Sequence, residues 1–236
     1  MSGGSVSLVV DDARCHVLTP VGEDYLKAVW TVGEWSDQPV TTNVLAKRMQ
    51  VAASTVSETV RRLTEQGLLE HRRYGAIELT EHGRSHAATM VRRHRLLETF
   101  LVQDLGYSWD EVHAEAEILE HAVSPLLIER IADRLGHPRR DPHGDPIPSP
   151  DGHARDRSPR LLATLPAGES GRVERISDND PDMLRWFASI GLVPDVRITV
   201  VERRAYAGLL QVTIDDDADP VDLGDIASRS VWLAPR

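Results

Sequence analysis

Residues 53–71 read ASTVSETVRRLTEQGLLEH, and this stretch decides how the first third of the chain folds. A helix is predicted from Ser54 to Gln66, because Ser54 is a favourable N-cap and Gly67 is suited to end the helix. Two short β-prone runs, LLEHRR and IELT, then follow around a Tyr-Gly turn. The stretch therefore predicts a helix that leads directly into a two-stranded hairpin.

Two more helices are predicted before this unit, from Gly22 to about Gly33 and from Thr42 to Met49. Three helices and a hairpin in this order are typical of a winged helix-turn-helix, whose third helix enters the major groove of double-stranded DNA. A structural domain with a basic surface is the alternative. The predicted DNA-binding residues are Ala53, Ser54, Thr55, Ser57, Glu58, Arg61, Arg62 and Arg73.

The charge of the chain is unevenly distributed. The formal net charge is -10, which argues against a generally basic nucleic-acid binder. Residues 41–95 nevertheless hold ten Lys and Arg, five Glu and no Asp, a net charge of +5. Because local charge decides what a surface attracts, this span favours contact with phosphates.

Two later segments carry His and Glu at helical spacing. Residues 113–123 read HAEAEILEHAV, and on a helix His113, Glu117, Glu120 and His121 fall within an arc of roughly 100°. RRHRLLETFL, at 92–101, places His94 and Glu98 one turn apart. Either pair alone fits a solvated surface, but both pairs on consecutive helices favour a divalent metal site.

The ligand types narrow the choice of metal. Carboxylate oxygens with imidazole suit Mn²⁺ or Fe²⁺, although Zn²⁺, Co²⁺ or Cd²⁺ could bind in vitro. Cys15 is the only cysteine, so no intrachain disulfide is possible and a reducing cytoplasm is expected. The N-terminus is not a convincing signal peptide, and no apolar run approaches the length of a membrane span.

The composition predicts several domains. A long helix is expected from about Glu81 to Leu105, another beginning near Ser108, and a third from about Ser124 to Leu135. A segment dense in Pro, Gly, Asp and Arg follows and is interpreted as a linker, and the remaining strands form a small, mostly β domain. The predicted division is an N-terminal arm (1–20), a DNA-binding domain (21–83), a helical dimerisation and metal-binding domain (84–136), the linker (137–164) and the β domain (165–236).

These residues resemble the diphtheria-toxin-repressor family of metal-dependent transcriptional regulators, and most closely its manganese-sensing branch. The resemblance is carried by EDYLKAVW (23–30), ASTVSETVRRLTEQGLLEH (53–71), VRRHRLLETFL (91–101) and WDEVHAEAEILEHAVS (109–124). DPHGDPIP (141–148) and the C-terminal strands match longer members. The resemblance implies a mainly α fold with small β parts, ending in an SH3-like β-barrel.

The family further implies a homodimeric repressor that binds its operator when divalent metal is present. A metal that joins the first helix to the later helices would fix the DNA-reading helix relative to its twin. The ligands implied by position are Asp24, His94, Glu98, His113, Glu117, Glu120 and His121. Iron sensors typically place Met and Cys at the positions of Asp24 and Glu117, so the resemblance favours Mn²⁺, with an Fe²⁺-responsive regulator as the alternative.

Two positions qualify the resemblance. Lys27 stands where short manganese sensors present a glutamate, so one expected ligand is absent. Longer members add a ligand from the C-terminal domain, and Asp178 is the candidate, with Glu174 as the alternative. A solvated acidic loop is the other interpretation of these two residues.

Other functional classes receive less support. A carboxylate-bridged dimetal enzyme usually needs two Glu-x-x-His pairs on different helices, and the chain has none. GxxxxGK and GxSxG motifs are absent as well. The sequence therefore predicts a protein that is not an enzyme and has no small-molecule substrate or membrane partner. An interaction module whose tail recruits a protein is the second alternative.

Overall fold

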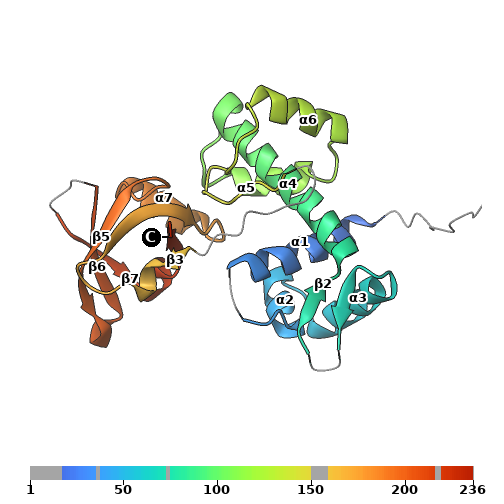
Figure 1. Ribbon diagram of the computed structural model, residues 1–236, viewed down its shortest axis with the longest axis horizontal. Coiled ribbons are helices and arrows are strands. Elements are labelled where there is room, and N and C mark those ends of the chain that lie inside the picture. The colour runs from blue at the N-terminus through green and yellow to red at the C-terminus, as the bar shows by residue number, and fades with distance from the viewer. Residues whose placement is uncertain (1–17, 36–37, 73–74, 150–158, 216–218, 236) are drawn as a thin grey trace, which may run out of the picture.

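The structure is a computed structural model that describes residues 18–35, 38–72, 75–149, 159–215 and 219–235 (Figure 1). Its elements form an N-terminal unit of helices with a small hairpin, a helical unit, and a C-terminal unit built around a sheet. Most of the predicted N-terminal arm and Arg73 lie outside the described residues. Among the described residues, none of the helices has the length and apolar composition needed to cross a bilayer.

The N-terminal unit has the predicted order of elements. It consists of α1 (Pro20–Trp35), α2 (Thr42–Met49), α3 (Ala53–Glu65), β1 (Leu69–His71) and β2 (Ile77–Leu79). Thr41 caps α2 by accepting a hydrogen bond from the Val44 amide at 3.3 Å. The prediction that Ser54 caps α3 is wrong, because the N-cap is Ala52 and Ser54 lies inside the first turn.

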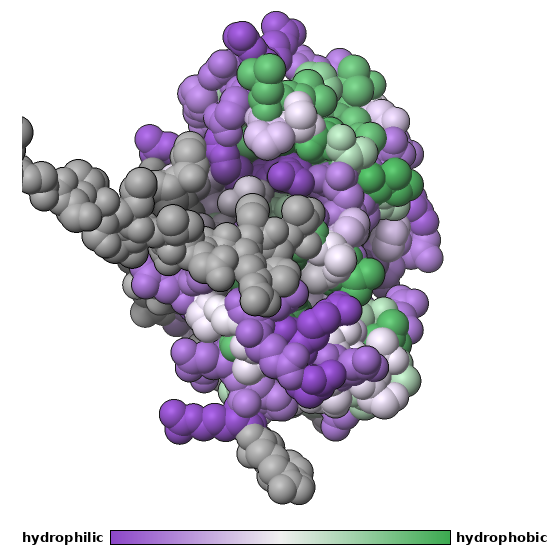
Figure 2. Space-filling model, turned by 90° about the vertical axis from the view of Figure 1, so that its right-hand side faces the viewer, coloured by the Kyte–Doolittle hydropathy of each residue, from purple (hydrophilic) through white to green (hydrophobic). Residues whose placement is uncertain are grey.

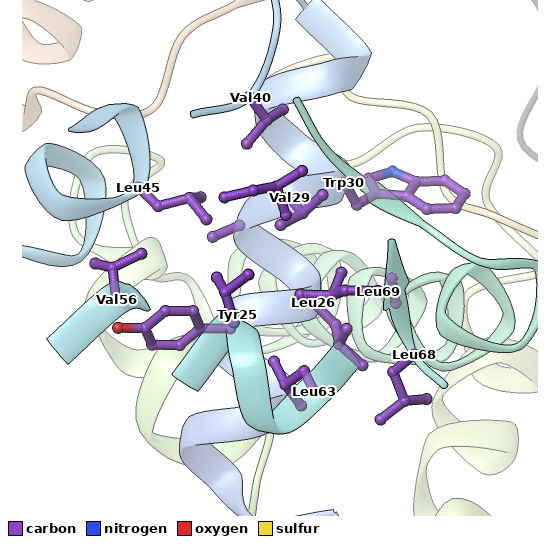
Figure 3. Packing of buried hydrophobic residues seen from close by; sticks show 14 of the residues in the cluster. Tyr25, Leu26, Val29, Trp30, Val40, Leu45, Val56, Leu63, Leu68 and Leu69 are labelled. Atoms are coloured by element: carbon purple, nitrogen blue, oxygen red, sulfur yellow. The ribbon is translucent and has the colours of Figure 1, made fainter. Parts of the chain in front are cut away.

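The core of this unit lies between α1 and α3 (Figure 3). Tyr25 and Leu26 on α1 are buried, as are Val56 and Leu63 on α3, and these side chains face one another in the close-up. The strands pair antiparallel, with Leu69 opposite Leu79. Helix α3 is therefore held in place by α1 together with α2 and β1.

The helical unit consists of α4 (Glu81–Leu105), α5 (Val112–Leu119) and α6 (Pro125–Arg134). Ser124 caps α6 by accepting from the Leu127 amide, and α4 has the bounds that the sequence predicts. Helix α5 is shorter than expected, since Glu120 is its C-cap and His121 lies in the following turn. The expected single helical face from 113 to 123 is therefore interrupted at its end.

The first part of the expected linker is packed rather than exposed. Asp141, His143 and Asp145 are all buried, and the Ile176 amide of β4 donates to the His143 carbonyl at 2.9 Å. Gly144 has φ +95°, and a Cβ there would lie 2.0 Å from the Glu174 carbonyl oxygen. Only glycine allows the segment to approach the sheet this closely. Residues 150–158 lie outside the described part of the chain.

The C-terminal unit contains one six-stranded sheet. The strand order is β3-β8-β4-β5-β6-β7, and every pairing is antiparallel. Within the described residues β3 and β7 are edge strands, so the expected SH3-like domain is present without the closed barrel that was predicted. The strands are β3 (Arg160–Leu161), β4 (Ser170–Ile176), β5 (Arg197–Arg204), β6 (Leu209–Ile214), β7 (Val221–Gly224) and β8 (Val231–Leu233).

Short helical pieces complete this unit and cover its core. The pieces are η1 (Leu162–Thr164), α7 (Pro181–Ser189), η2 (Ala205–Ala207) and α8 (Asp225–Ser228). Phe187 and Leu184 on α7 are fully buried against strand residues such as Ile198.

Candidate metal centre

The two His/Glu pairs predicted on neighbouring helices meet in the structure. Helix α5 packs against α4, and the His94 ring Nε2 lies 3.1 Å from Nδ1 of His113. Both rings contact the same carboxylate oxygen, Glu98 Oε1, at 3.0 and 3.1 Å. Glu117 lies at the open side, with Oε1 3.6 Å from His113 Nε2. The α4–α5 contact therefore gathers four of the predicted ligands.

His143 and Asp141 join this group, although neither was predicted from the sequence as a ligand. His143 is fully buried, and its Nε2 lies 2.6 Å from the Trp109 carbonyl oxygen. Because a carbonyl only accepts, Nε2 carries the proton, and Nδ1 faces Glu98 Oε2 at 3.8 Å without a hydrogen-bond partner. Glu98, Asp141 and His143 offer ligand atoms within 4.8 Å of one another. The motif DPHGDPIP contained the signal, since it places a histidine between two aspartates.

The C-terminal unit contributes one carboxylate to the centre. Asp178 follows β4, and its Oδ2 lies 3.2 Å from His113 Nδ1. Glu98, His113 and Asp178 form another group with ligand atoms within 4.8 Å. The alternative candidate, Glu174, lies instead beside Pro146 and Trp35 in a separate cavity. Of the two acids that the sequence offered as a ligand, the structure therefore places Asp178, and not Glu174, beside His113.

A second cluster joins the start of α1 to the end of α5. His121 Nε2 lies 2.8 Å from Asp24 Oδ1 and 3.5 Å from Glu120 Oε1. His121 Nδ1 lies 3.0 Å from Oε2 of Glu23, which was not predicted from the sequence as a ligand. Asp24, Glu120 and His121 offer ligand atoms within 4.8 Å of one another.

Glu120 links the two clusters, because its carboxylate is fully buried between them. Its Oε2 lies 2.6 Å from Nδ1 of His94, and its Oε1 accepts from Nζ of Lys27 at 2.5 Å. Lys27 also donates to Glu117 Oε1 at 2.7 Å. The guanidinium of Arg93 holds the Glu120 carbonyl at 2.9 Å. Because α5 ends at Leu119, the Glu120 carboxylate lies between the two clusters and contacts a histidine of each.

Opposite charges shift the pKa values of these groups strongly. Burial lowers the pKa of His94, but Glu98 and Glu120 outweigh burial and raise it to about 9. Burial likewise lowers the pKa of His113, whereas Asp178 and Glu98 raise it to about 11. For Glu98 burial raises the pKa, yet the surrounding histidines lower it well below its usual range. Protonated imidazoles thus balance the carboxylates in the metal-free protein.

The donor set suits a hard or borderline divalent cation. It consists of carboxylate oxygens and imidazole nitrogens, with no thiolate among the described residues of either cluster. The unpartnered Nδ1 of His143 points toward a carboxylate that a cation could bridge. All eight predicted ligands lie in these clusters: Asp24, His94, Glu98, His113, Glu117, Glu120, His121 and Asp178.

A different buried cluster of charged side chains is centred on Arg95, the residue that follows His94 on α4. The Arg95 guanidinium donates to both Glu34 carboxylate oxygens, at 3.2 and 2.6 Å, and its Nη2 lies 3.6 Å from Asp145 Oδ1. Arg175 of β4 donates to the same Asp145 oxygen at 2.5 Å. Asp141 lies 3.7 Å from Arg95 Nε. We call this set, Glu34, Arg95, Asp141, Asp145 and Arg175, the arginine cluster.

The predicted DNA-contacting residues form one exposed surface on α3. Each described member of the set is exposed, while Val56, Val60 and Leu63 on the other side of the helix are buried. The Ser57 hydroxyl donates to the Ala53 carbonyl at 2.9 Å, and Arg61 donates to Glu65 at 2.6 Å. The exposed members are Ala53, Ser54, Thr55, Ser57, Glu58, Arg61 and Arg62.

Comparison with known protein families gives three consecutive matches. Residues 17–77 match the N-terminal DNA-binding domain of iron-dependent repressors, and residues 80–149 match the metal-binding and dimerisation domain of the same proteins. Residues 160–228 match the FeoA domain. The three matches follow the three units of the structure.

Individual relatives cover most of the chain. The iron-dependent repressor IdeR of Mycobacterium leprae is 34% identical over 78% of this chain and 84% of its own length. The diphtheria toxin repressor of Corynebacterium glutamicum is 34% identical over 91% of this chain and 96% of its own length. A solved structure of a manganese-dependent transcriptional repressor in complex with manganese is 54% identical, with a TM-score of 0.86 and coverage of 91% and 100%.

Proposed function

The chain belongs to the iron-dependent repressor family, and we propose that it is a Mn²⁺-responsive transcriptional repressor that binds operator DNA as a homodimer. The observation that carries the proposal is the pair of His/carboxylate clusters held between the DNA-binding unit and the helical unit. Such a protein acts on DNA in the cytoplasm and needs no small-molecule substrate. The family gives no support to the dimetal-enzyme alternative.

Ligand chemistry favours Mn²⁺ over Fe²⁺. Asp24 and Glu117 supply hard oxygens at the positions where the resemblance expects a softer Met and Cys in iron sensors. The solved structure that is 54% identical is that of a manganese-dependent transcriptional repressor in complex with manganese. Fe²⁺ is the second candidate, because the family and several relatives are named for iron.

We assign the ligands to two groups. Asp24, Glu120 and His121 would hold one ion between α1 and the end of α5. A second ion would lie near Glu98, with candidate ligands His94, His113, Glu117, Asp141, His143 and Asp178. A bound ion would supply the positive charge that protons and Lys27 supply in its absence.

Helix α1 connects the first group to the DNA-reading surface. Asp24 faces the metal cluster, while its neighbours Tyr25 and Leu26 pack against α3 through residues such as Val56. A ligand that fixes α1 relative to α5 therefore also fixes α3, because packed helices move together. In the metal-free protein the contact between α1 and the end of α5 is made by His121 with Asp24 and Glu23, and by Lys27 with Glu117 and Glu120.

The helical unit offers a surface for a second copy of the chain. Figure 2 shows apolar atoms gathered over the upper part of the molecule, where the helical unit of Figure 1 lies. Ile118 of α5 and Leu126 of α6 are 71% and 68% exposed, and Leu127 is also exposed. Apolar patches of this kind are typical of homodimer interfaces. A dimer would present two α3 helices to successive major grooves.

Replacement of a single proposed ligand tests this function. Duplexes selected by the protein from a random pool in the presence of Mn²⁺ would serve as operator probes. We expect Asp24→Ala to remain a folded dimer whose DNA affinity no longer rises with Mn²⁺, whereas Asp133→Ala, which removes an exposed carboxylate of α6, keeps the response. An unchanged Mn²⁺ response of Asp24→Ala would contradict the proposed mechanism.

A further inference from the structure

Lys27 places a permanent positive charge inside the proposed metal centre. It lies on α1 one turn after Asp24, and its side chain is only 13% exposed. Its Nζ donates to Glu117 Oε1 at 2.7 Å and to Glu120 Oε1 at 2.5 Å. The ammonium group therefore binds two of the carboxylates that the proposed function assigns to metal ions.

The ammonium and a metal ion would need the same oxygen. Glu120 Oε2 faces His94 at 2.6 Å, which leaves Oε1 as the oxygen on the side of His121, at 3.5 Å from Nε2. Lys27 occupies that oxygen. A divalent ion bound among Asp24, Glu120 and His121 would therefore meet the ammonium at short range, and two cations repel strongly in a partly buried site.

We propose that Lys27 is a built-in competitor for the metal: its ammonium occupies Glu117 and Glu120 in the metal-free protein and must leave Glu120 when a divalent ion binds. Lys27 then sets the metal concentration at which the protein responds. This inference rests on the proposed function, since it assumes that the Asp24–Glu120–His121 cluster binds Mn²⁺. Lysine suits this role because its ammonium is a point charge on a flexible stem and can move aside without unfolding the helix.

Neutral replacement of Lys27 gives the sharpest test. In Lys27→Met the carboxylates of Glu117 and Glu120 lose their resident cation, so an incoming ion has no ammonium to displace. We expect the variant to bind Mn²⁺ roughly tenfold to hundredfold more tightly, because it lacks the close repulsion between the ammonium and the metal ion. Lys27→Arg keeps the charge and is expected to bind Mn²⁺ no more tightly than the unchanged protein.

Lys47 provides a matched control. It lines the same groove as Lys27 and Glu117, on α2, and among the described residues it forms no ion pair with either cluster. Lys47→Met removes the same charge from the groove without freeing a carboxylate, so its Mn²⁺ affinity should change by less than about threefold. Calorimetric titration of the full-length, metal-free proteins with Mn²⁺, in competition with a chelator of known affinity, measures all four values.

The outcomes separate this inference from the proposed function. Normal Mn²⁺ binding by the unchanged protein, with equal or weaker binding by Lys27→Met, would overturn the role of Lys27 and leave the proposed function intact. Failure of the unchanged protein to bind Mn²⁺ would overturn both. Should Lys27→Met not fold, Lys27→Gln is measured instead, and a crystal structure of the Mn²⁺-loaded protein is decisive. An ammonium still bound to Glu120 Oε1 beside the metal would contradict the proposal.

Discussion

Two buried clusters of carboxylates lie side by side on α4, and they are balanced by different cations. In the metal centre Glu98 and Glu120 are matched by histidines and Lys27. In the arginine cluster Glu34 and Asp145 are matched by Arg95 and Arg175. His94 and Arg95 are adjacent in the sequence, so a single helix supplies the centre of both clusters.

The difference between the cations determines what each cluster can do. A guanidinium stays charged at all accessible pH values and holds a carboxylate through two parallel hydrogen bonds, as Arg95 holds Glu34. Imidazolium can release its proton, and an ammonium can swing away. In the arginine cluster Glu34 and Asp145 therefore keep their guanidinium partners, whereas the metal centre can exchange its cations. Carboxylates alone do not identify a metal site; the groups that balance them do.

The arginine cluster also ties all three units together. Arg95 belongs to the helical unit and Glu34 to the N-terminal unit, while Arg175 belongs to the sheet. The Arg175 guanidinium lies 3.8 Å from the Trp35 ring centroid and 4.4 Å from that of Trp232, in a cation–π arrangement. This cluster therefore holds the three units to one another through buried charged groups.

Removal of Arg95 should give the largest effect and would test whether this cluster is structural. Arg95→Met leaves Glu34, Asp141 and Asp145 without their central partner. Breaking a buried ion pair from one side costs about 3–5 kcal/mol of unfolding free energy. Urea denaturation should show this loss both with and without Mn²⁺.

An exposed arginine supplies the control for that experiment. Arg134 pairs with Asp104 at 3.2 Å, and its side chain is 70% exposed. Arg134→Met should change the unfolding free energy by less than about 1 kcal/mol, because exposed pairs contribute little. A similarly small change in Arg95→Met would show that the arginine cluster contributes no more to stability than an exposed ion pair.

The sequence predicted the metal centre better than the arginine cluster, for a physical reason. His94 and Glu98 are one helical turn apart, so local geometry alone placed them on one face. His143 and Asp141 escaped prediction because their segment has the composition of a loop, and it is ordered by docking on β4 rather than by local preference. The pairing of Lys27 with Glu120 spans 93 residues and depends on the early end of α5.

Helices α2 and α4 have the bounds that the sequence predicts, whereas the prediction of a closed barrel was wrong. Helix α4 begins after Thr80, which caps it through the Gly83 amide at 2.9 Å, and ends at Gly106 in the left-handed conformation. The open edges at β3 and β7 have no comparable signal, since sheet closure depends on tertiary packing. Local sequence signals thus located the helices that hold most of the metal ligands. The C-terminal unit adds Asp178 to the centre through tertiary packing.

The pH dependence of metal binding would sharpen the same comparison, with an intermediate effect. The pKa of His94 is raised to about 9 and that of His113 to about 11, so both imidazoles are protonated at neutral pH without metal. Mn²⁺ must displace these protons. Its apparent affinity should therefore rise between pH 6 and 8 by about tenfold per pH unit for each proton released. Calorimetry in two buffers of different ionisation enthalpy counts the protons.

The stability of the metal-free protein should change with pH in the opposite direction. A raised pKa means that the ion pairs of His94 stabilise the fold fully below its ordinary value of 6.5 and lose this contribution as the pH rises through about 9. The Arg95 contribution should stay constant across this range, since the pKa of its guanidinium is raised further still. Mn²⁺ binding without proton release at pH 7 would contradict the protonated state of both imidazoles.

The smallest effect is expected where an ion pair lies at the surface. Arg61 donates to Glu65 at 2.6 Å across one turn of α3, but the two side chains are 65% and 61% exposed. Glu65→Gln should therefore change the unfolding free energy by less than about 0.5 kcal/mol, in contrast to Arg95→Met. The same variant releases Arg61 toward DNA phosphates and removes a negative charge from α3, so DNA affinity at low salt should rise about threefold. Gel-shift titration at two salt concentrations measures this gain, which should shrink as salt increases because the contact is solvent-exposed. A loss of stability as large as that of Arg95→Met would mean that burial does not separate structural ion pairs from surface ones in this protein.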